Sequence, residues 1–130
     1  MAIVQQDITK AVNNWGESLI AISRAYEDDG LESARTIAEQ TLDRLYGFEL
    51  GPVLFKPTLS GGPQTFRLTK IGALSYFIGN DPEYPNDSGF GIKFWRSVKS
   101  ETSATLIQND VAMWMGWVNF IDKNNRTVRV

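Results

Sequence analysis

The sequence predicts an α+β fold in which about three N-terminal helices pack on a curved, mostly antiparallel sheet. Two changes in pattern predict it. Apolar residues recur every three or four positions in the first half, which is typical of helices, whereas from Gly91 they alternate with polar residues, as in strands. The chain has 130 residues, the length of one ordinary domain with a single hydrophobic core. We therefore expect residues 1–130 to form one domain.

Two helices are predicted first. One begins at Asp7, a good N-cap residue, and ends at Gly30, which accepts the left-handed conformation that closes a helix. The next covers residues 31–45. Gly16 lies inside the first helix, where glycine costs about 1 kcal/mol relative to alanine. We therefore expect the backbone of another element to approach closely at Gly16.

The middle of the chain changes character. Residues 53–56 are expected to form a short strand, and residues 60–63 a flexible loop. A third helix should follow, with Thr69 as its N-cap and Gly79 as its stop. Residues 80–89 are dense in turn formers and acidic side chains, so they predict a surface loop that could serve as a lid.

The last part of the chain predicts an antiparallel meander. A long strand is expected over residues 92–107, with a bulge near 101–103. Asn109 tolerates the positive φ that a tight hairpin turn demands. The returning strand, 111–121, is apolar on both faces and should therefore be covered on both. A second turn leads into a strand over residues 127–130.

The composition excludes much of the familiar catalytic chemistry. The chain has neither histidine nor cysteine, which removes imidazole and thiolate nucleophiles, bases and metal ligands. We therefore expect no metal site and no cofactor. The remaining candidates for chemistry are carboxylates, Tyr, Lys, Arg, Ser and Thr.

Charge and hydropathy favour some partners and cellular locations over others. Its net charge is −2 and its basic residues are scattered, so a nucleic acid is not expected as a partner. The N-terminus has no basic segment followed by an apolar one, as a signal peptide would. The longest apolar run, 111–118, is well below the ~20 residues of a spanning helix. We expect a cytoplasmic protein that does not enter a membrane.

One run of residues is typical of a known superfamily. The segment Ile107-Gln108-Asn109-Asp110-Val111-Ala112 resembles the I-x-G-D-x-A hairpin of SnoaL-like proteins, members of the nuclear transport factor 2-like superfamily, with Asn109 standing where Gly is usual. Gly47, residues 55–58 and residues 69–77 resemble segments of an uncharacterised subgroup. The resemblance covers roughly the whole chain and implies the cone-like fold of that superfamily.

The resemblance also implies an incomplete sheet. Members of the superfamily usually continue for two further long strands after the position of Val128, so we expect a shortened C-terminus and an exposed sheet edge. Trp114 and Trp117 lie on opposite faces of one strand, and one of them should meet a helix or a second subunit. We therefore expect a homodimer.

Three functions remain open at this stage. The resemblance implies an uncharacterised domain that binds a small, largely apolar molecule between sheet and helices. The expected lining residues are Trp15, Tyr76, Trp95, Met115 and Asn119. The first alternative is an isomerase, cyclase or dehydratase of the SnoaL and ketosteroid-isomerase kind that uses a carboxylate or Tyr, with no catalytic residue assigned. The second is a dimerising protein-interaction module.

Several polar residues have two interpretations. Asn119 could orient a ligand, but a cross-strand hydrogen bond is favoured. Tyr76 and Tyr84 could donate to a bound carbonyl group, although packing with a hydrated hydroxyl is the commoner role. Asp110 follows the turn at Asn109, and we expect it to close the hairpin rather than act as a base.

Two sets of charged side chains could bind ions. One set is basic and consists of Lys56, Arg67 and Arg96. The other set is acidic and lies in one loop: Asp81, Glu83 and Asp87. For both sets, solvated surface charge is favoured over an ion-binding site. The acidic loop also lacks the regular ligand spacing of a calcium site.

Overall fold

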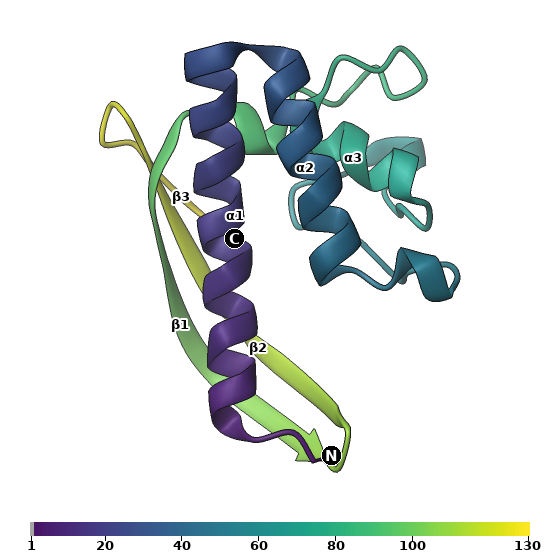
Figure 1. Ribbon diagram of the computed structural model, residues 1–130, viewed down its shortest axis with the longest axis vertical. Coiled ribbons are helices and arrows are strands. Elements are labelled where there is room, and N and C mark those ends of the chain that lie inside the picture. Colours follow the sequence, from purple (N-terminus) through teal and green to yellow (C-terminus); the bar gives the residue numbers. More distant parts are fainter. Residues whose placement is uncertain (1) are drawn as a thin grey trace.

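The computed structural model describes residues 2–130 and confirms the predicted α+β class (Figure 1). The helices are α1 (Gln5–Asp29), α2 (Leu31–Leu45) and α3 (Lys70–Ile78). The strands β1 (Trp95–Gln108), β2 (Val111–Asp122) and β3 (Thr127–Arg129) form an antiparallel sheet in the order β1-β2-β3. Helix α1 lies along the β1–β2 hairpin; α2 packs beside α1 at one end of that hairpin, and α3 packs on α2.

The helix ends follow local capping rules, with one correction. Helix α3 starts as predicted, because the Thr69 hydroxyl accepts a hydrogen bond from the Gly72 amide at 3.2 Å. Helix α1 starts earlier than predicted, with Val4 as its N-cap. Asp7 is not the cap itself: it sits in the first turn, and its carboxylate accepts the Val4 amide at 2.9 Å. The Asp7 carboxylate still accepts a hydrogen bond from an otherwise free amide at the helix start. This explains why Asp7 indicated a helix start that lies one turn after the observed one.

Two strand predictions were wrong in their extent. Residues 53–56 form no strand, since only isolated hydrogen bonds connect them to the neighbouring segment, and Pro57 has no amide to extend a ladder. The long strand starts at Trp95 instead of residue 92, because Phe90–Ile92 form a 3-10 turn and Phe94 has a φ of 62°. The bulge near 101–103 is confirmed by a register shift between Thr102 and Ala104.

A buried polar contact joins α1 to the start of the sheet. The Ser23 hydroxyl donates to the Gly91 carbonyl at 2.6 Å and accepts the Trp95 amide at 3.0 Å. The Trp95 indole N–H donates to the Phe90 carbonyl at 2.6 Å. These bonds satisfy polar groups inside the core, and they fix the position of Phe90, a residue of the site described below.

The two faces of the sheet differ in their burial. Even-numbered residues of β2, such as Val118 and Phe120, face the helices and are buried. Five large apolar side chains point to the opposite side and are 51–65% exposed: Leu106, Val111, Met113, Met115 and Trp117. We call this set the outer apolar face. The expectation that β2 is covered on both faces is therefore wrong for the described chain, although Trp114 and Trp117 do lie on opposite faces as predicted.

Gly16 is a site of close approach, but to a side chain. A Cβ atom built on Gly16 would lie 2.8 Å from Cγ1 of Val98 on β1, so the expected backbone contact is replaced by a contact with a branched side chain. We expect Gly16→Ala to lower the free energy of unfolding by about 1–3 kcal/mol, as overpacking does, despite the better helix propensity of alanine. Urea unfolding measures this change.

The control for Gly16→Ala is a double-mutant cycle with Val98→Ala. The second substitution removes the contacting methyl groups, so the coupling free energy should be favourable. A Gly16→Ala variant as stable as the unmodified protein would contradict the contact.

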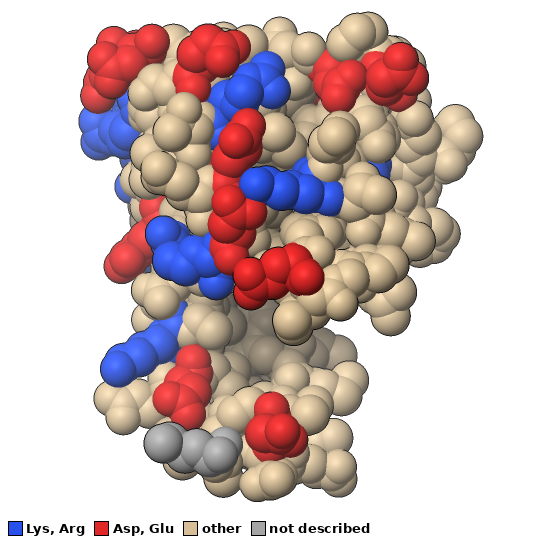
Figure 2. Space-filling model, turned by 45° about the vertical axis from the view of Figure 1, so that its right-hand side comes forward, with Lys and Arg blue, Asp and Glu red and all other residues tan. Residues whose placement is uncertain are grey.

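The surface carries mixed charge. Lysine and arginine side chains lie among aspartates and glutamates on the face shown in Figure 2, and no continuous basic patch covers that face. Within residues 2–130, no helix combines the length and the apolar character needed to cross a membrane.

Candidate functional site

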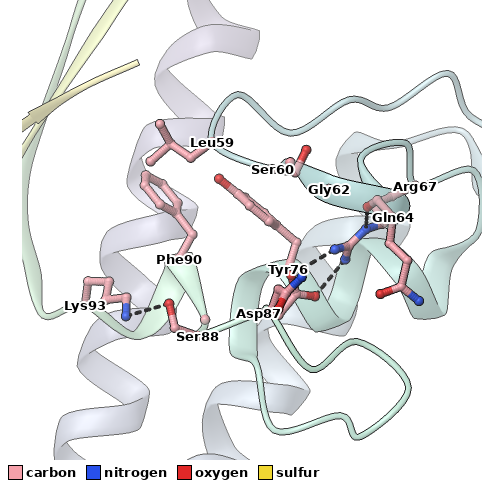
Figure 3. Close-up of a pocket in the computed structure, with 13 residues that line it drawn as sticks. Leu59, Ser60, Gly62, Gln64, Arg67, Tyr76, Asp87, Ser88, Phe90 and Lys93 are labelled. Carbon is pink, nitrogen blue, oxygen red and sulfur yellow. Dashed lines mark hydrogen bonds and ion pairs between the residues drawn. The ribbon is translucent and has the colours of Figure 1, made fainter.

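A pocket of about 400 Å³ opens between the loop that precedes α3, α3 itself and the loop that follows it (Figure 3). Its lining residues lie within 59–67 and 86–93, with Tyr76 of α3 between them. The lining combines apolar side chains, hydroxyl groups, two side-chain amides and charged groups, so it suits a small polar molecule. We call it the Tyr76 pocket.

Aromatic neighbours hold the Tyr76 ring in one orientation. The Phe90 ring stacks on it at 5.8 Å with an interplanar angle of 16°. Phe77 and Phe55 contact it edge-on, at 5.5 and 6.4 Å. The phenol hydroxyl points toward Leu59, away from the ion pair at the other end of the pocket (Figure 3). The ring is therefore fixed by packing while its hydroxyl faces the pocket.

The phenol of Tyr76 is protonated at neutral pH. Burial raises the pKa of Tyr76, and the negative charge of Asp87 adds to the rise. A hydrogen bond with the Leu59 backbone and the positive charge of Arg67 oppose this rise without cancelling it. Tyr76 can therefore donate a hydrogen bond to a bound molecule and accept one from water.

A buried ion pair forms the other end of the pocket. The Arg67 and Asp87 side chains are only 3% and 6% exposed. Their contact is bidentate, with Nη1 to Oδ2 at 2.7 Å and Nη2 to Oδ1 at 2.8 Å. The expectation that Arg67 and Asp87 are solvated is thus wrong. Each side chain is buried together with a partner of opposite charge, which offsets the free-energy cost of removing it from water.

Further hydrogen bonds complete this ion pair. Arg67 also donates to the carbonyls of Gln64 and Gly72, at 2.7 and 2.8 Å. Asp87 accepts the Ser75 hydroxyl at 2.7 Å. The pKa of Asp87 lies below its usual value: burial raises it, but the hydrogen bonds from Arg67 and Ser75 and the charge of Arg67 outweigh that effect. Asp87 is therefore ionised at neutral pH.

The other basic candidates do not join Arg67. Lys56 donates to the carbonyls of Thr58 and Ser60 and so ties its own loop together. Arg96 pairs with Glu27 on α1. Lys93 reaches the rim of the Tyr76 pocket, where it donates to the Ser88 hydroxyl at 2.9 Å. Lys56, Arg67 and Arg96, the three basic side chains considered from the sequence, thus form no common anion site.

The structure places the five expected lining residues apart. Tyr76 lines the pocket, and Trp95 lies in the core, where it contacts Phe90. Trp15 lines a separate apolar groove and donates to the Tyr46 hydroxyl at 2.9 Å. Met115 and Asn119 point away from the helices, because odd-numbered residues of β2 form the outer side of the sheet.

Asn119 makes the cross-strand contact that was favoured from sequence. Its side-chain amide donates to the Glu101 carboxylate on β1 at 2.7 Å. The residues that instead face Tyr76, among them Ser60, Gln64 and Phe90, were not expected there. Their only sequence signal was their position in turn-rich segments beside helix α3.

Metal ligands do not gather in the described chain. Over residues 2–130, no group of three or more Asp or Glu side chains lies close enough to hold an ion, and the sequence contains no His or Cys. The chemistry that the pocket offers is that of a protonated phenol, hydroxyl and amide side chains, the Lys93 ammonium group and a neutralised pair of charges.

Comparison with known proteins places this geometry in context. The family model described as "Metal-independent carbonic anhydrase" (MICAH) matches residues 6–130. A metal-independent carbonic anhydrase of Nostoc sp. (strain PCC 7120 / SAG 25.82 / UTEX 2576) is 43% identical over 129 residues, which are 99% of this chain and 63% of that protein. The chain therefore spans less than two thirds of the length of this curated relative.

A solved structure is similar over the same region. It is the crystal structure of the iota-carbonic anhydrase from a cyanobacterium complexed with bicarbonate. Its TM-score is 0.97 at 43% identity, and the match covers 99% of this chain and 79% of that one.

These matches overturn the affiliation and the functions expected from the sequence. The resemblance to an uncharacterised SnoaL-like subgroup was wrong, since a characterised family matches nearly the whole chain. The expected apolar ligand, the isomerase-type enzyme and the interaction module fall with it, because both relatives are carbonic anhydrases and one was crystallised with bicarbonate, a small polar anion.

Proposed function

The chain belongs to the family of metal-independent carbonic anhydrases, and on that premise we propose that it catalyses the reversible hydration of carbon dioxide to bicarbonate at the Tyr76 pocket. The observation that carries the location is the protonated phenol of Tyr76, held by aromatic packing in a pocket lined by polar groups. The bicarbonate in the crystals of the cyanobacterial relative supports the substrate class.

Hydration transfers a proton from the attacking water to a substrate oxygen, and one group that both donates and accepts a proton can carry this transfer without a metal. The water oxygen forms a bond to the carbon of carbon dioxide, and one C=O electron pair moves to a substrate oxygen. In our proposal, Tyr76 gives its phenol proton to that oxygen while its own oxygen takes a proton from the attacking water. Carbonic acid is formed, Tyr76 is restored, and the acid releases a proton to solvent as bicarbonate.

The raised pKa of Tyr76 suits this role. A phenolate has no proton to donate to the developing oxyanion, whereas the protonated phenol has one at the start of each catalytic cycle. Asp87 is paired with Arg67 and has a lowered pKa, so it does not compete for the proton.

Stopped-flow hydration of carbon dioxide with a pH indicator tests the proposal. We expect the purified chain to accelerate hydration above the buffer rate, and we expect dialysis against a chelator to leave that rate unchanged. The curated relative is longer than this chain, and the chain alone could be less active than the relative. The rate should therefore be measured over a series of protein concentrations that extends to high values. A rate equal to that of buffer throughout the series would overturn the proposal.

We also propose that the chain forms a homodimer through the outer apolar face. Its five side chains are contiguous in the β1–β2 register and uncovered in this chain, and exposed apolar patches of this kind mark association sites. Both signs of charge border the face, since Glu101 and Arg129 lie beside Trp117. Such a face can pair with a copy of itself around a two-fold axis. The cytoplasmic location stays a prediction.

Met115→Lys tests the dimer. A charge at the centre of the face should raise the dimer dissociation constant by at least about 30-fold, as the loss of an interface hot spot does, and native mass spectrometry measures it. Leu54→Lys is the matched control, since Leu54 is 92% exposed in a loop far from the sheet in sequence. Dimers of unchanged strength in Met115→Lys, or monomers in the unmodified protein, would contradict the interface.

A further inference from the structure

We propose that the buried Arg67–Asp87 pair is a positioning pair that fixes the Tyr76 hydroxyl for catalysis. The inference rests on the function proposed above and adds residues to it. Neither side chain has to touch the substrate for this role, because the pair acts through the segments that carry Tyr76 and the groups around it.

Three segments that shape the pocket meet at the Asp87 carboxylate. Arg67 lies at the end of the loop that carries Leu59, and its guanidinium donates to both carboxylate oxygens. Ser75 on α3 donates its hydroxyl to Oδ2 of the same carboxylate at 2.7 Å. Asp87 itself belongs to the loop that leads to Phe90 (Figure 3).

Each of these segments touches the phenol. Ser75 directly precedes Tyr76, so its bond to Asp87 sets the rotation of that turn of α3. Phe90 stacks on the Tyr76 ring, and Leu59 lies beside the hydroxyl. Breaking the pair would therefore loosen the ring and the hydroxyl end together, without removing the phenol or the aromatic side chains that pack on it.

The loop at 80–89 is pinned by the same pair. Gly79 and Gly89 close the loop against itself, since a Cβ built on Gly79 would lie 3.0 Å from the Gly89 amide nitrogen. Arg67 also lies 4.5 Å from the centre of the Tyr84 ring in that loop. The loop that was expected to serve as a lid is thus held in place by these contacts and forms a fixed side of the pocket. A fixed pocket suits a site in which the phenol must keep one orientation.

The two charges of the pair act on Tyr76 in opposite directions. Asp87 raises the pKa of Tyr76 and Arg67 lowers it. Removing only the negative charge should therefore lower the pKa of Tyr76, whereas Arg67→Lys, which retains the positive charge, should disturb geometry more than titration. This difference gives the proposal a spectroscopic signature.

The test combines kinetics with NMR of tyrosine labelled with ¹³C at Cζ, in the whole chain. In Asp87→Asn we expect kcat for hydration to fall about 10- to 100-fold, as small misplacements of a reacting group do, with KM changed less than about twofold because asparagine keeps the size of the side chain that lines the pocket at this position. The Tyr76 signal, assigned with Tyr76→Phe, should shift and titrate at lower pH. Ser75→Ala and Arg67→Lys are milder variants for use if Asp87→Asn does not fold.

Glu27→Gln is the matched control, because it breaks the Arg96–Glu27 ion pair, and neither residue lines the Tyr76 pocket. It should change neither kcat nor the Tyr76 signal. A Tyr76 signal that is unmoved in Asp87→Asn, Ser75→Ala and Arg67→Lys would overturn the positioning role, whatever the rates. A shifted signal with kcat unchanged would overturn it too. A shifted signal in a chain that never hydrates carbon dioxide would uphold the geometric link and instead refute the proposed reaction.

Discussion

Replacing Tyr76 with phenylalanine will reduce kcat for carbon dioxide hydration by at least about 100-fold, as loss of a single transition-state hydrogen-bond donor does. The ring keeps its contacts with Phe90, Phe77 and Phe55, so the fold should be retained. The hydroxyl is the group that the proposed step uses twice, once as a donor and once as an acceptor. Stopped-flow hydration at neutral pH measures the effect.

Tyr46→Phe is the control for this substitution. Tyr46 is a second half-buried phenol, whose pKa is raised by burial to about 12, and its hydroxyl accepts the Trp15 indole N–H outside the Tyr76 pocket. We expect this variant to lose up to about 1.5 kcal/mol of stability with the hydrogen bond and to keep its activity. Equal rates for Tyr76→Phe and the unmodified protein would remove Tyr76 from the mechanism.

Removing the Asp87 carboxylate will destabilise the fold by about 3–5 kcal/mol, because Asp87→Ala leaves the Arg67 guanidinium buried without its counter-charge. Arg67 is 3% exposed and cannot reach solvent without moving its loop. Domains of this size have unfolding free energies of roughly 5–15 kcal/mol, so the variant should unfold at much lower urea concentration. A loss below about 1 kcal/mol would show that the pair is no more than a surface contact.

The same pair makes stability depend on acid. The folded pKa of Asp87 is below its ordinary value of 3.8, so its contribution is complete above that value and declines as the pH falls through the folded pKa. Urea midpoints measured between neutral pH and pH 2 should therefore drop at the acid end. The drop should be smaller in Asp87→Asn, which has no carboxylate to protonate.

The helices and the hairpin were predictable because their signals are local. The cap at Thr69, the turn at Asn109 and the bulge near Thr102 each depend on neighbours within a few residues. The short strand at 53–56 was not predictable from its apolar residues, because a strand needs a partner, and the segment beside it supplies only isolated hydrogen bonds.

The site was less predictable than the fold. Tyr76 was singled out by residue type, and the structure places it in a pocket. Arg67 and Asp87 were considered separately as surface charges, since nothing local indicates that two irregular segments 20 positions apart would bury them together. Met115 and Asn119 were placed on the ligand side because the apolar pattern of β2 does not distinguish its two faces.

The contact of Ser23 with Gly91 and Trp95 joins segments that are synthesised far apart in time. Helices α1 and α2 leave the ribosome before the sheet does, and the residues that cover the apolar side of α1 are made about 70 positions later. Until residues 90–120 have been translated, the helical hairpin has no sheet to pack against. We therefore expect this part of a nascent chain to stay sensitive to protease until those residues have left the ribosome.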